Sequence, residues 1–198
     1  AENHAVSYAT SKGCIVVASA GNDGNKQHNY PASYDGVISV GSIDINLQVS
    51  SFSQHNNKID IVAPGENIFT TAGWLKNPYY SDYLYVSGTS FSAPYVSGIA
   101  ALTSAVKPSI TAHEFMEILE ITSTDLGPTG YDNYYGYGLI NAEKILQSVS
   151  TIKVKSISLN KSSITLKKIL KNPVLRPAII RSMRVSVFFE HKTPLIPF

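Results

Sequence analysis

Ser90 is the residue whose type and position best suit a chemical step. It lies in the stretch 87–94, and an apolar run with helical spacing follows as far as Val106. Pro94 is compatible with a helix that begins near Ser90, because the first helical N–H groups have no intrahelical acceptor. A hydroxyl at a helix start lies where the helix dipole favours negative charge, as attack on a carbonyl requires. An ordinary N-capping serine gives the same local pattern, so this stretch alone leaves both interpretations open.

Asn22 is the second candidate. It lies in the glycine-rich turn 19–24, directly after the apolar run 14–20. A short continuous apolar run predicts a parallel strand that is buried on both faces. A glycine-rich turn after a strand can bind a dinucleotide, but the Gly-x-Gly-x-x-Gly pattern is absent here, which excludes that class. Taken alone, Asn22 is equally well explained as a turn residue that tolerates positive φ.

Four separate stretches resemble the subtilisin-like serine peptidases. Residues 88–94 resemble their serine signature, Gly-Thr-Ser-x-(Ser or Ala)-x-Pro, and 19–24 resemble their Ala-x-Gly-Asn-x-Gly motif. Residues 30–41 and 134–141 resemble two further family stretches, in the same order along the chain. The Gly-x-Ser-x-Gly elbow of α/β-hydrolases does not fit, because Ser92 occupies the place of the second glycine.

The resemblance implies a role for each matching residue. Ser90 would attack the peptide carbonyl and form an acyl-enzyme, and the Asn22 side chain would donate to the resulting oxyanion. A fixed neutral amide suits that task, because it stabilises the developing charge without needing a counter-charge of its own. Ser19, Ala20 and Gly21 would form one wall of the pocket for the residue before the scissile bond.

The resemblance further implies a weakly bound structural cation, Ca²⁺ or monovalent, on the backbone carbonyls of Ala32, Tyr34 and Val37. Hard cations do bind carbonyl oxygens, but a loop without any ion explains the same residues. No cofactor is expected for the chemistry itself.

The sequence lacks the two family motifs that supply the catalytic base and the carboxylate that orients it. Family members carry an Asp-(Ser or Thr)-Gly motif and a His-Gly-Thr motif upstream of the asparagine, and this chain contains neither. We therefore expect residues 1–149 to be the C-terminal part of a peptidase domain truncated at its N-terminus, and inactive alone. A non-catalytic peptide-binding module is the alternative.

The expected fold is α/β, a three-layer α/β/α sandwich with a parallel sheet built from runs 14–20, 37–43 and 59–62. The lone Cys14 excludes an internal disulfide, and its apolar run predicts that it packs in the core. Residues 111–114 predict a capping box that opens a further helix.

The pattern of apolar and polar residues changes after residue 149. Residues 150–168 resemble a linker and the start of a bacterial immunoglobulin-like repeat, since 157–166 alternate between apolar and polar residues. Residues 169–198 follow no period, and we interpret them as the product of a shift in reading frame near Lys168. A short basic adapter or anchor is the alternative for this tail.

Composition restricts the partners. The net charge of +2 gives no reason to expect nucleic acid or an anionic membrane. No apolar run reaches the roughly 18 residues of a membrane span. We expect a polypeptide substrate and, from the family resemblance, an extracellular or cell-surface location, although no signal peptide is recognisable. The sequence is silent on oligomeric state.

Overall fold

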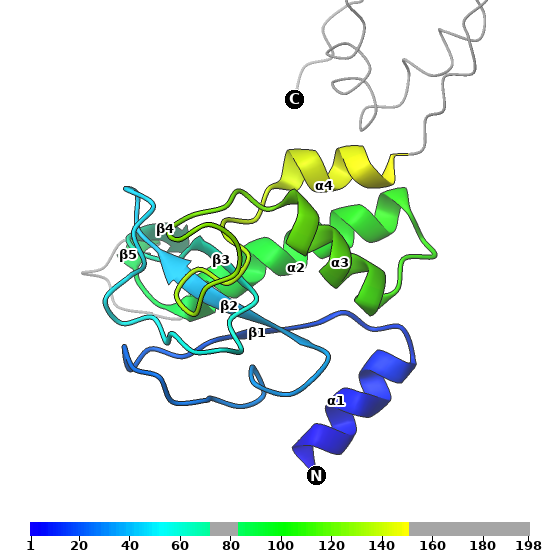
Figure 1. Cartoon of the computed structure of the whole chain (residues 1–198), viewed down its shortest axis with the longest axis horizontal. Helices are drawn as coiled ribbons and strands as arrows, with labels where there is room; N and C mark the ends of the chain where they lie inside the picture. The colour runs from blue at the N-terminus through cyan, green and yellow to red at the C-terminus, as the bar shows by residue number, and fades with distance from the viewer. Residues whose placement is uncertain (72–82, 151–198) are drawn as a thin grey trace, which may run out of the picture. The chain divides into compact units, whose positions relative to one another are not determined.

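A computed structural model describes residues 1–71 and 83–150 of the chain (Figure 1). Contacts group Ala1–Thr151 into one compact unit. The expectations for residues 151–168 and 169–198 lie outside the described residues and stay predictions. None of the described helices is long and apolar enough to cross a lipid bilayer.

The sheet has three parallel strands, in the order β1 (Val16–Ser19), β2 (Val37–Ile43) and β3 (Ile61–Pro64). Val16 of β1 is opposite Val37 of β2, and Val40 of β2 is opposite Ile61 of β3. The expected parallel sheet of an α/β fold is therefore confirmed. The third strand begins two residues later than expected, at Ile61.

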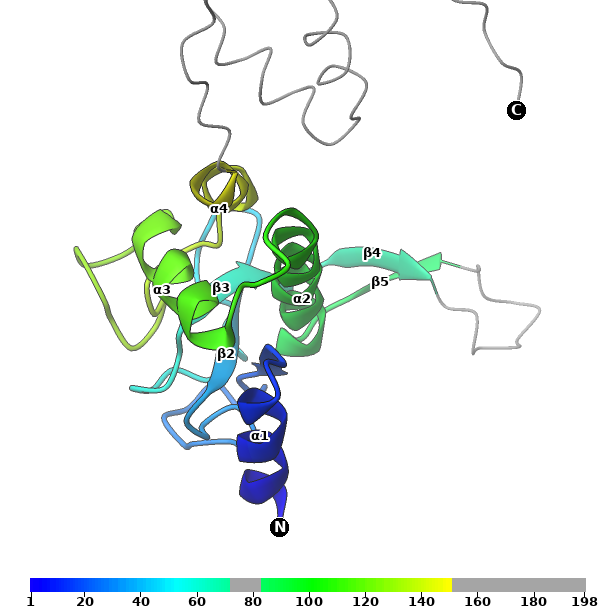
Figure 2. The ribbon, with the colours of Figure 1, turned by 90° about the vertical axis from the view of Figure 1, so that its right-hand side faces the viewer.

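Within the described residues, four helices accompany the sheet: α1 (Glu2–Ser11), α2 (Thr89–Val106), α3 (Ala112–Thr122) and α4 (Ala142–Val149). The capping box is confirmed, because the Thr111 hydroxyl accepts from the Glu114 backbone and the Glu114 carboxylate accepts from the Thr111 backbone. Strands β4 (Ile68–Thr71) and β5 (Tyr83–Val86) form an antiparallel hairpin that extends away from the sheet (Figure 2).

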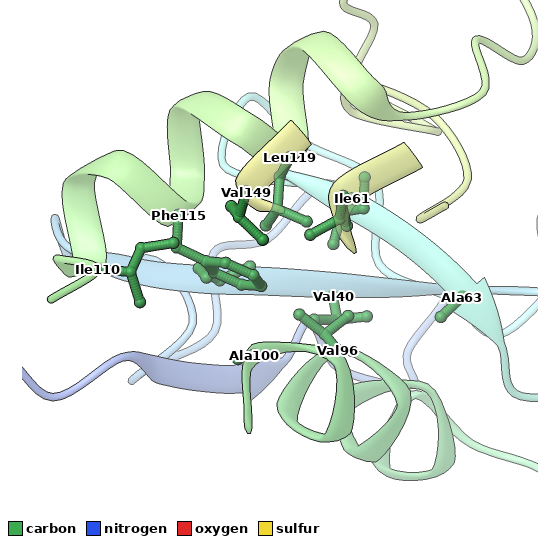
Figure 3. Packing of buried hydrophobic residues seen from close by; sticks show 11 residues of the cluster. Val40, Ile61, Ala63, Val96, Ala100, Ile110, Phe115, Leu119 and Val149 are labelled. Carbon is green, nitrogen blue, oxygen red and sulfur yellow. The ribbon is translucent and has the colours of Figure 1, made fainter. Parts of the chain in front are cut away.

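The core joins the central strands to helices α2, α3 and α4 (Figure 3). Val40 on β2 and Val96 on α2 are both fully buried, as is Phe115 on α3. Burying a side chain of this kind contributes about 1.5–3 kcal/mol to folding. This core fixes helix α2, and with it Ser90, against the sheet.

Two expectations from the sequence are wrong, the burial of strand β1 on both faces and the burial of Cys14. Strand β1 is only half-buried along its whole length, although its run predicted burial on both faces. Cys14 is exposed and lies before the strand begins, so it does not pack in the core. The physical reason is that β1 pairs with β2 alone, and no described element covers its other edge.

Gly65 directly follows β3 and packs against the start of α2. A Cβ atom at this position would lie 2.1 Å from the Ser92 Oγ, 2.5 Å from the Ser42 Oγ and 2.9 Å from the Gly88 carbonyl oxygen. Real Cβ atoms do not approach other atoms so closely, so a side chain here must push strand and helix apart. Glycine at this position is therefore a packing requirement.

We expect Gly65→Ala to lower the free energy of unfolding by about 1–3 kcal/mol, the usual cost of overpacking. Gly98→Ala is the matched control, because a Cβ there meets nothing within 4 Å and the residue lies inside helix α2. That substitution should stabilise the chain by up to about 1 kcal/mol through helix propensity. Urea unfolding of both variants measures the difference. A Gly65→Ala midpoint equal to that of the unsubstituted chain would contradict this account of the junction.

Candidate active site

Ser90 and Asn22 come from two elements that meet at one end of the sheet. Asn22 follows the carboxyl end of β1, and Ser90 is the second residue of α2. The start of α2 is attached to the end of β3 by a hydrogen bond from the Gly88 amide to the Gly65 carbonyl, of 2.8 Å. Gly88 has φ 153°, a conformation that only glycine adopts readily. The carboxyl ends of parallel strands are the usual place for binding sites in open α/β sheets.

The Asn22 side chain is held by the residue directly before Ser90. Its Oδ1 accepts hydrogen bonds from the Thr89 backbone N–H and from the Thr89 hydroxyl, each 2.9 Å long. With its oxygen engaged in this way, the amide presents its Nδ2 as a donor. The first helical N–H groups, that of Ser90 among them, also lack an intrahelical acceptor. The arrangement thus offers two hydrogen-bond donors at the start of α2, the Asn22 amide and the Ser90 backbone N–H.

Thr89 and Gln54 are two supporting residues that the sequence analysis missed. Gln54 is fully buried, and its Oε1 accepts from the backbone N–H groups of Asp23 and Asn25. Its Nε2 donates to the Asn25 Oδ1 at 2.8 Å. Gln54 therefore fixes the loop that follows Asn22. The sequence signals were the threonine within the serine signature 88–94 and the polar Gln54, which follows a serine-rich stretch, 50–53.

Ser90 is exposed and lines an open hollow of about 500 Å³. The hollow is also lined by residues of β1 and by the first turns of α2, namely Val17, Ala18, Ser19, Ala93, Pro94 and Ser97, together with Pro31. The nearby Ser92, by contrast, is fully buried, and its Oγ has no hydrogen-bond partner. Of these two serines, only Ser90 can meet a substrate.

None of the residues that line the Ser90 hollow is a base. Among the described histidines, His28 hydrogen-bonds the Asn57 side chain at 2.8 Å, and His55 stacks on Tyr134. His113 pairs with Glu117 on α3, and His4 is exposed on α1. The described residues that line the hollow therefore include no group that could accept the Ser90 proton.

The three residues expected to form a pocket wall lie at different depths. Ser19 lines the hollow beside Ser90. Ala20 is buried, with 2% of its surface exposed. Gly21 donates its backbone N–H to the Thr89 hydroxyl, and this hydrogen bond helps to fix the loop that carries Asn22.

The residues expected to bind a cation form a tight turn. The Tyr34 carbonyl oxygen accepts the Val37 N–H at 3.2 Å, and Ala32 is buried. The described residues contain no group of three or more His, Cys, Asp or Glu side chains suited to a metal ion. A cation at this turn would therefore need backbone carbonyl oxygens as its ligands, and its presence stays a prediction.

Asp60 is a half-buried carboxylate that bonds strand β2 and the turn at Tyr137. Its Oδ2 accepts the Ser39 N–H at 2.7 Å, and its backbone carbonyl accepts the Tyr137 N–H. Burial raises the pKa of Asp60 to about 6, against the hydrogen bond from Ser39 and the charge of Lys58. The charge of Glu120 makes the smallest contribution to this rise.

Because folding raises the pKa of Asp60 from 3.8, the folded chain binds this proton more tightly than the unfolded chain. Its stabilising contribution is present below pH 3.8, falls as the pH rises to about 6, and is lost above that value. The shift corresponds to about 3 kcal/mol. We expect Asp60→Asn to remove this fall in the free energy of unfolding, measured by urea unfolding at several pH values.

Asp35 is the control for that measurement, because its pKa is lowered by a hydrogen bond from Lys58. Asp35→Asn should leave the fall in stability between pH 4 and 6 in place. A stability that is flat over this range in the unsubstituted chain would contradict the buried, protonated state of Asp60.

Comparison with known proteins gives a consistent result. The model of the subtilase family, a peptidase family, matches residues 1–138. Subtilisin BL of Lederbergia lenta is 42% identical over 139 residues, which are 70% of this chain and 48% of that protein. Subtilisin DY of Bacillus licheniformis is 39% identical over 147 residues, 72% of this chain and 50% of that protein.

The fold is also similar to that of a solved structure. The crystal structure of a lanthipeptide protease superposes with a TM-score of 0.67 and 27% identity, over 74% of this chain and 54% of that one. The chain spans about half the length of the curated relatives that it matches.

Proposed function

The chain belongs to the subtilase family, and on this premise we propose that it forms part of a serine endopeptidase in which Ser90 is the nucleophile. The Ser90 hydroxyl attacks the carbonyl carbon of a peptide bond and forms an acyl-enzyme, which water then hydrolyses. A base outside the described residues takes the hydroxyl proton and passes it to the leaving amine.

The observation that carries this proposal is the pair of hydrogen bonds from Thr89 to the Asn22 oxygen. They direct the amide nitrogen away from Thr89 and fix it beside the helix that bears Ser90. A carbonyl oxygen that becomes negative during attack is stabilised by such a donor, because the donor needs no reorganisation at that moment.

A chimaera tests the proposal. The 139 residues of this chain that align with subtilisin BL replace the matching segment of that protein, so that the relative supplies the remainder of the domain. We expect the folded chimaera to hydrolyse a fluorogenic peptide and Ser90→Ala to abolish that activity. Ser92→Ala is the matched control and should leave the rate unchanged, because the Ser92 hydroxyl is buried and makes no hydrogen bond.

A non-catalytic peptide-binding module is the second candidate, since no described residue that lines the Ser90 hollow is a base. The two candidates differ in the chimaera. A chimaera with a cooperative unfolding transition, peptide binding and no hydrolysis would support the second candidate and contradict the first. For the parent protein we also propose action outside the cell, on the ground of family resemblance.

A further inference from the structure

Two Asp-Gly pairs occur in the chain, Asp23-Gly24 and Asp35-Gly36. In such a pair the backbone nitrogen of the glycine can attack the carboxyl carbon of the aspartate side chain, because glycine has no Cβ atom to hinder the approach. Loss of water then closes a five-membered succinimide ring. Both aspartates are exposed, so solvent reaches the two pairs alike. The two glycine nitrogens, however, differ in their hydrogen bonds.

The Asp23-Gly24 pair is held closed. The Gly24 N–H donates to the Phe52 carbonyl oxygen at 2.7 Å. The Asp23 N–H donates to the Gln54 side chain at 3.0 Å. A Cβ atom at Gly24 would lie 2.5 Å from the Ser51 carbonyl oxygen, so the backbone is tightly enclosed on this side. Ring closure at Asp23 therefore requires that the loop first open locally.

The Asp35-Gly36 pair lies in an exposed turn. The Val37 N–H donates to the Tyr34 carbonyl oxygen across this turn, and Gly36 has φ 83°, which glycine adopts readily. Among the described residues, no acceptor receives the Gly36 N–H. The Asp35 side chain is 95% exposed. The nitrogen and the carboxyl group are thus both accessible in the folded chain.

We propose that Asp35-Gly36 is a site of spontaneous isomerisation, at which the folded chain converts aspartate into isoaspartate. The Gly36 nitrogen loses its proton and forms a bond to the Asp35 Cγ, from which the hydroxyl leaves as water. A second water molecule then opens the succinimide, so the composition of the chain does not change. Opening at the α-carbonyl leaves the main chain running through Cβ and Cγ, one carbon atom longer. This inference does not depend on the proposed function.

The turn at Asp35 connects several parts of the fold, so a longer main chain should disturb all of them. The Tyr34 hydroxyl donates to the Glu2 carboxylate of α1 at 3.2 Å. The Asp35 carboxylate pairs with the Lys58 ammonium at 2.8 Å. Val37 is the first residue of β2 and is buried. We therefore expect the isoaspartate form to unfold at a lower urea concentration than the aspartate form.

Lys58 slows the reaction. The hydrogen bond from the Lys58 ammonium, together with its charge, lowers the pKa of Asp35. A neutral carboxyl group loses its hydroxyl more readily than a carboxylate does, so the ion pair disfavours ring closure. We expect Lys58→Met to raise the rate of isomerisation about two- to fivefold, the effect of one exposed ion pair.

Peptide mapping of the complete 198-residue chain tests the inference. The chain is incubated in water enriched in heavy oxygen, both folded and in urea, and a cooperative unfolding transition verifies the folded sample. Each ring opening adds a heavy oxygen atom to the aspartate, and electron-transfer dissociation distinguishes isoaspartate from aspartate. Asp35→Glu is the matched control, because it keeps the carboxylate but needs a six-membered ring, which forms far more slowly.

In the folded chain we expect isoaspartate to accumulate about three- to tenfold faster at Asp35 than at Asp23, the effect of one backbone hydrogen bond. In urea the two rates should be similar, because the Gly24 N–H is then free. Asp35→Glu should incorporate no heavy oxygen at this position.

Equal rates at the two pairs in the folded chain, incorporation that persists in Asp35→Glu, or no incorporation at Asp35 would each overturn the inference. An isoaspartate form with an unchanged urea midpoint would overturn its structural consequence, the disturbance of the turn.

Discussion

The isolated 198-residue chain should hydrolyse a fluorogenic peptide no faster than its Ser90→Ala variant. None of the described residues that line the Ser90 hollow is a base, so we expect the hydroxyl to keep its proton at neutral pH and to attack poorly. In a subtilisin, loss of the serine or of the histidine alone lowers kcat by about 2 × 10⁶. The oxyanion donors that remain supply only about 10³–10⁴ over the uncatalysed reaction.

The comparison needs both proteins at equal concentration, with folding verified by a cooperative urea transition. A rate for the unsubstituted chain that clearly exceeds that of Ser90→Ala would show that one of its five histidines acts as base. In that case our account of the incomplete site would be wrong.

Asn22→Ala in the chimaera should lower kcat by about 10²–10³ while KM changes little, the cost of one oxyanion donor measured in a subtilisin. The reason is that the Asn22 amide interacts with the oxygen mainly once it has become negative, in the transition state. The effect falls on kcat because the ground-state carbonyl carries little charge.

Thr89→Val is the companion to that variant. It removes the hydroxyl that donates to the Asn22 oxygen but keeps the backbone N–H bond, so its loss of kcat should be smaller. Equal kcat values for Asn22→Ala and the unsubstituted chimaera would contradict the role of Asn22. This conclusion does not depend on whether the Thr89→Val variant folds.

Much of the fold could be predicted because periodicity and burial agree in its centre. The run 37–43 became a fully buried parallel strand, and Thr111 with Glu114 formed the expected helix cap. Boundaries were less certain, since the third strand begins at Ile61 and not at Ile59. Strand ends depend on which backbone groups find partners in the neighbouring strand, and that information is not local.

The β1 region shows where sequence prediction and structure disagree for a physical reason. An apolar run predicts burial, but burial needs a neighbour, and β1 has a neighbour on one side only among the described residues. Cys14 is exposed for the same reason. The apolar run of β1 therefore predicts a contact on its second edge that the described residues do not supply.

The candidate site was predictable in its residues but not in its supports. Ser90 and Asn22 each lie in a motif with a recognisable spacing. Thr89 holds Asn22 across 67 positions of the chain, and Gln54 holds the loop after Asn22 across about thirty. Contacts at such separations follow from the packing of the sheet and leave no local pattern.

Covalent labelling of the active chimaera tests the central claim most directly. A fluorophosphonate reacts with a serine whose hydroxyl is activated by a base, and mass spectrometry of the digested protein identifies the modified residue. We predict a single modification, on Ser90, which disappears in Ser90→Ala and persists in Ser92→Ala. A modification on Ser92, or a hydrolysing chimaera in which Ser90 remains unmodified, would contradict the assignment of the nucleophile.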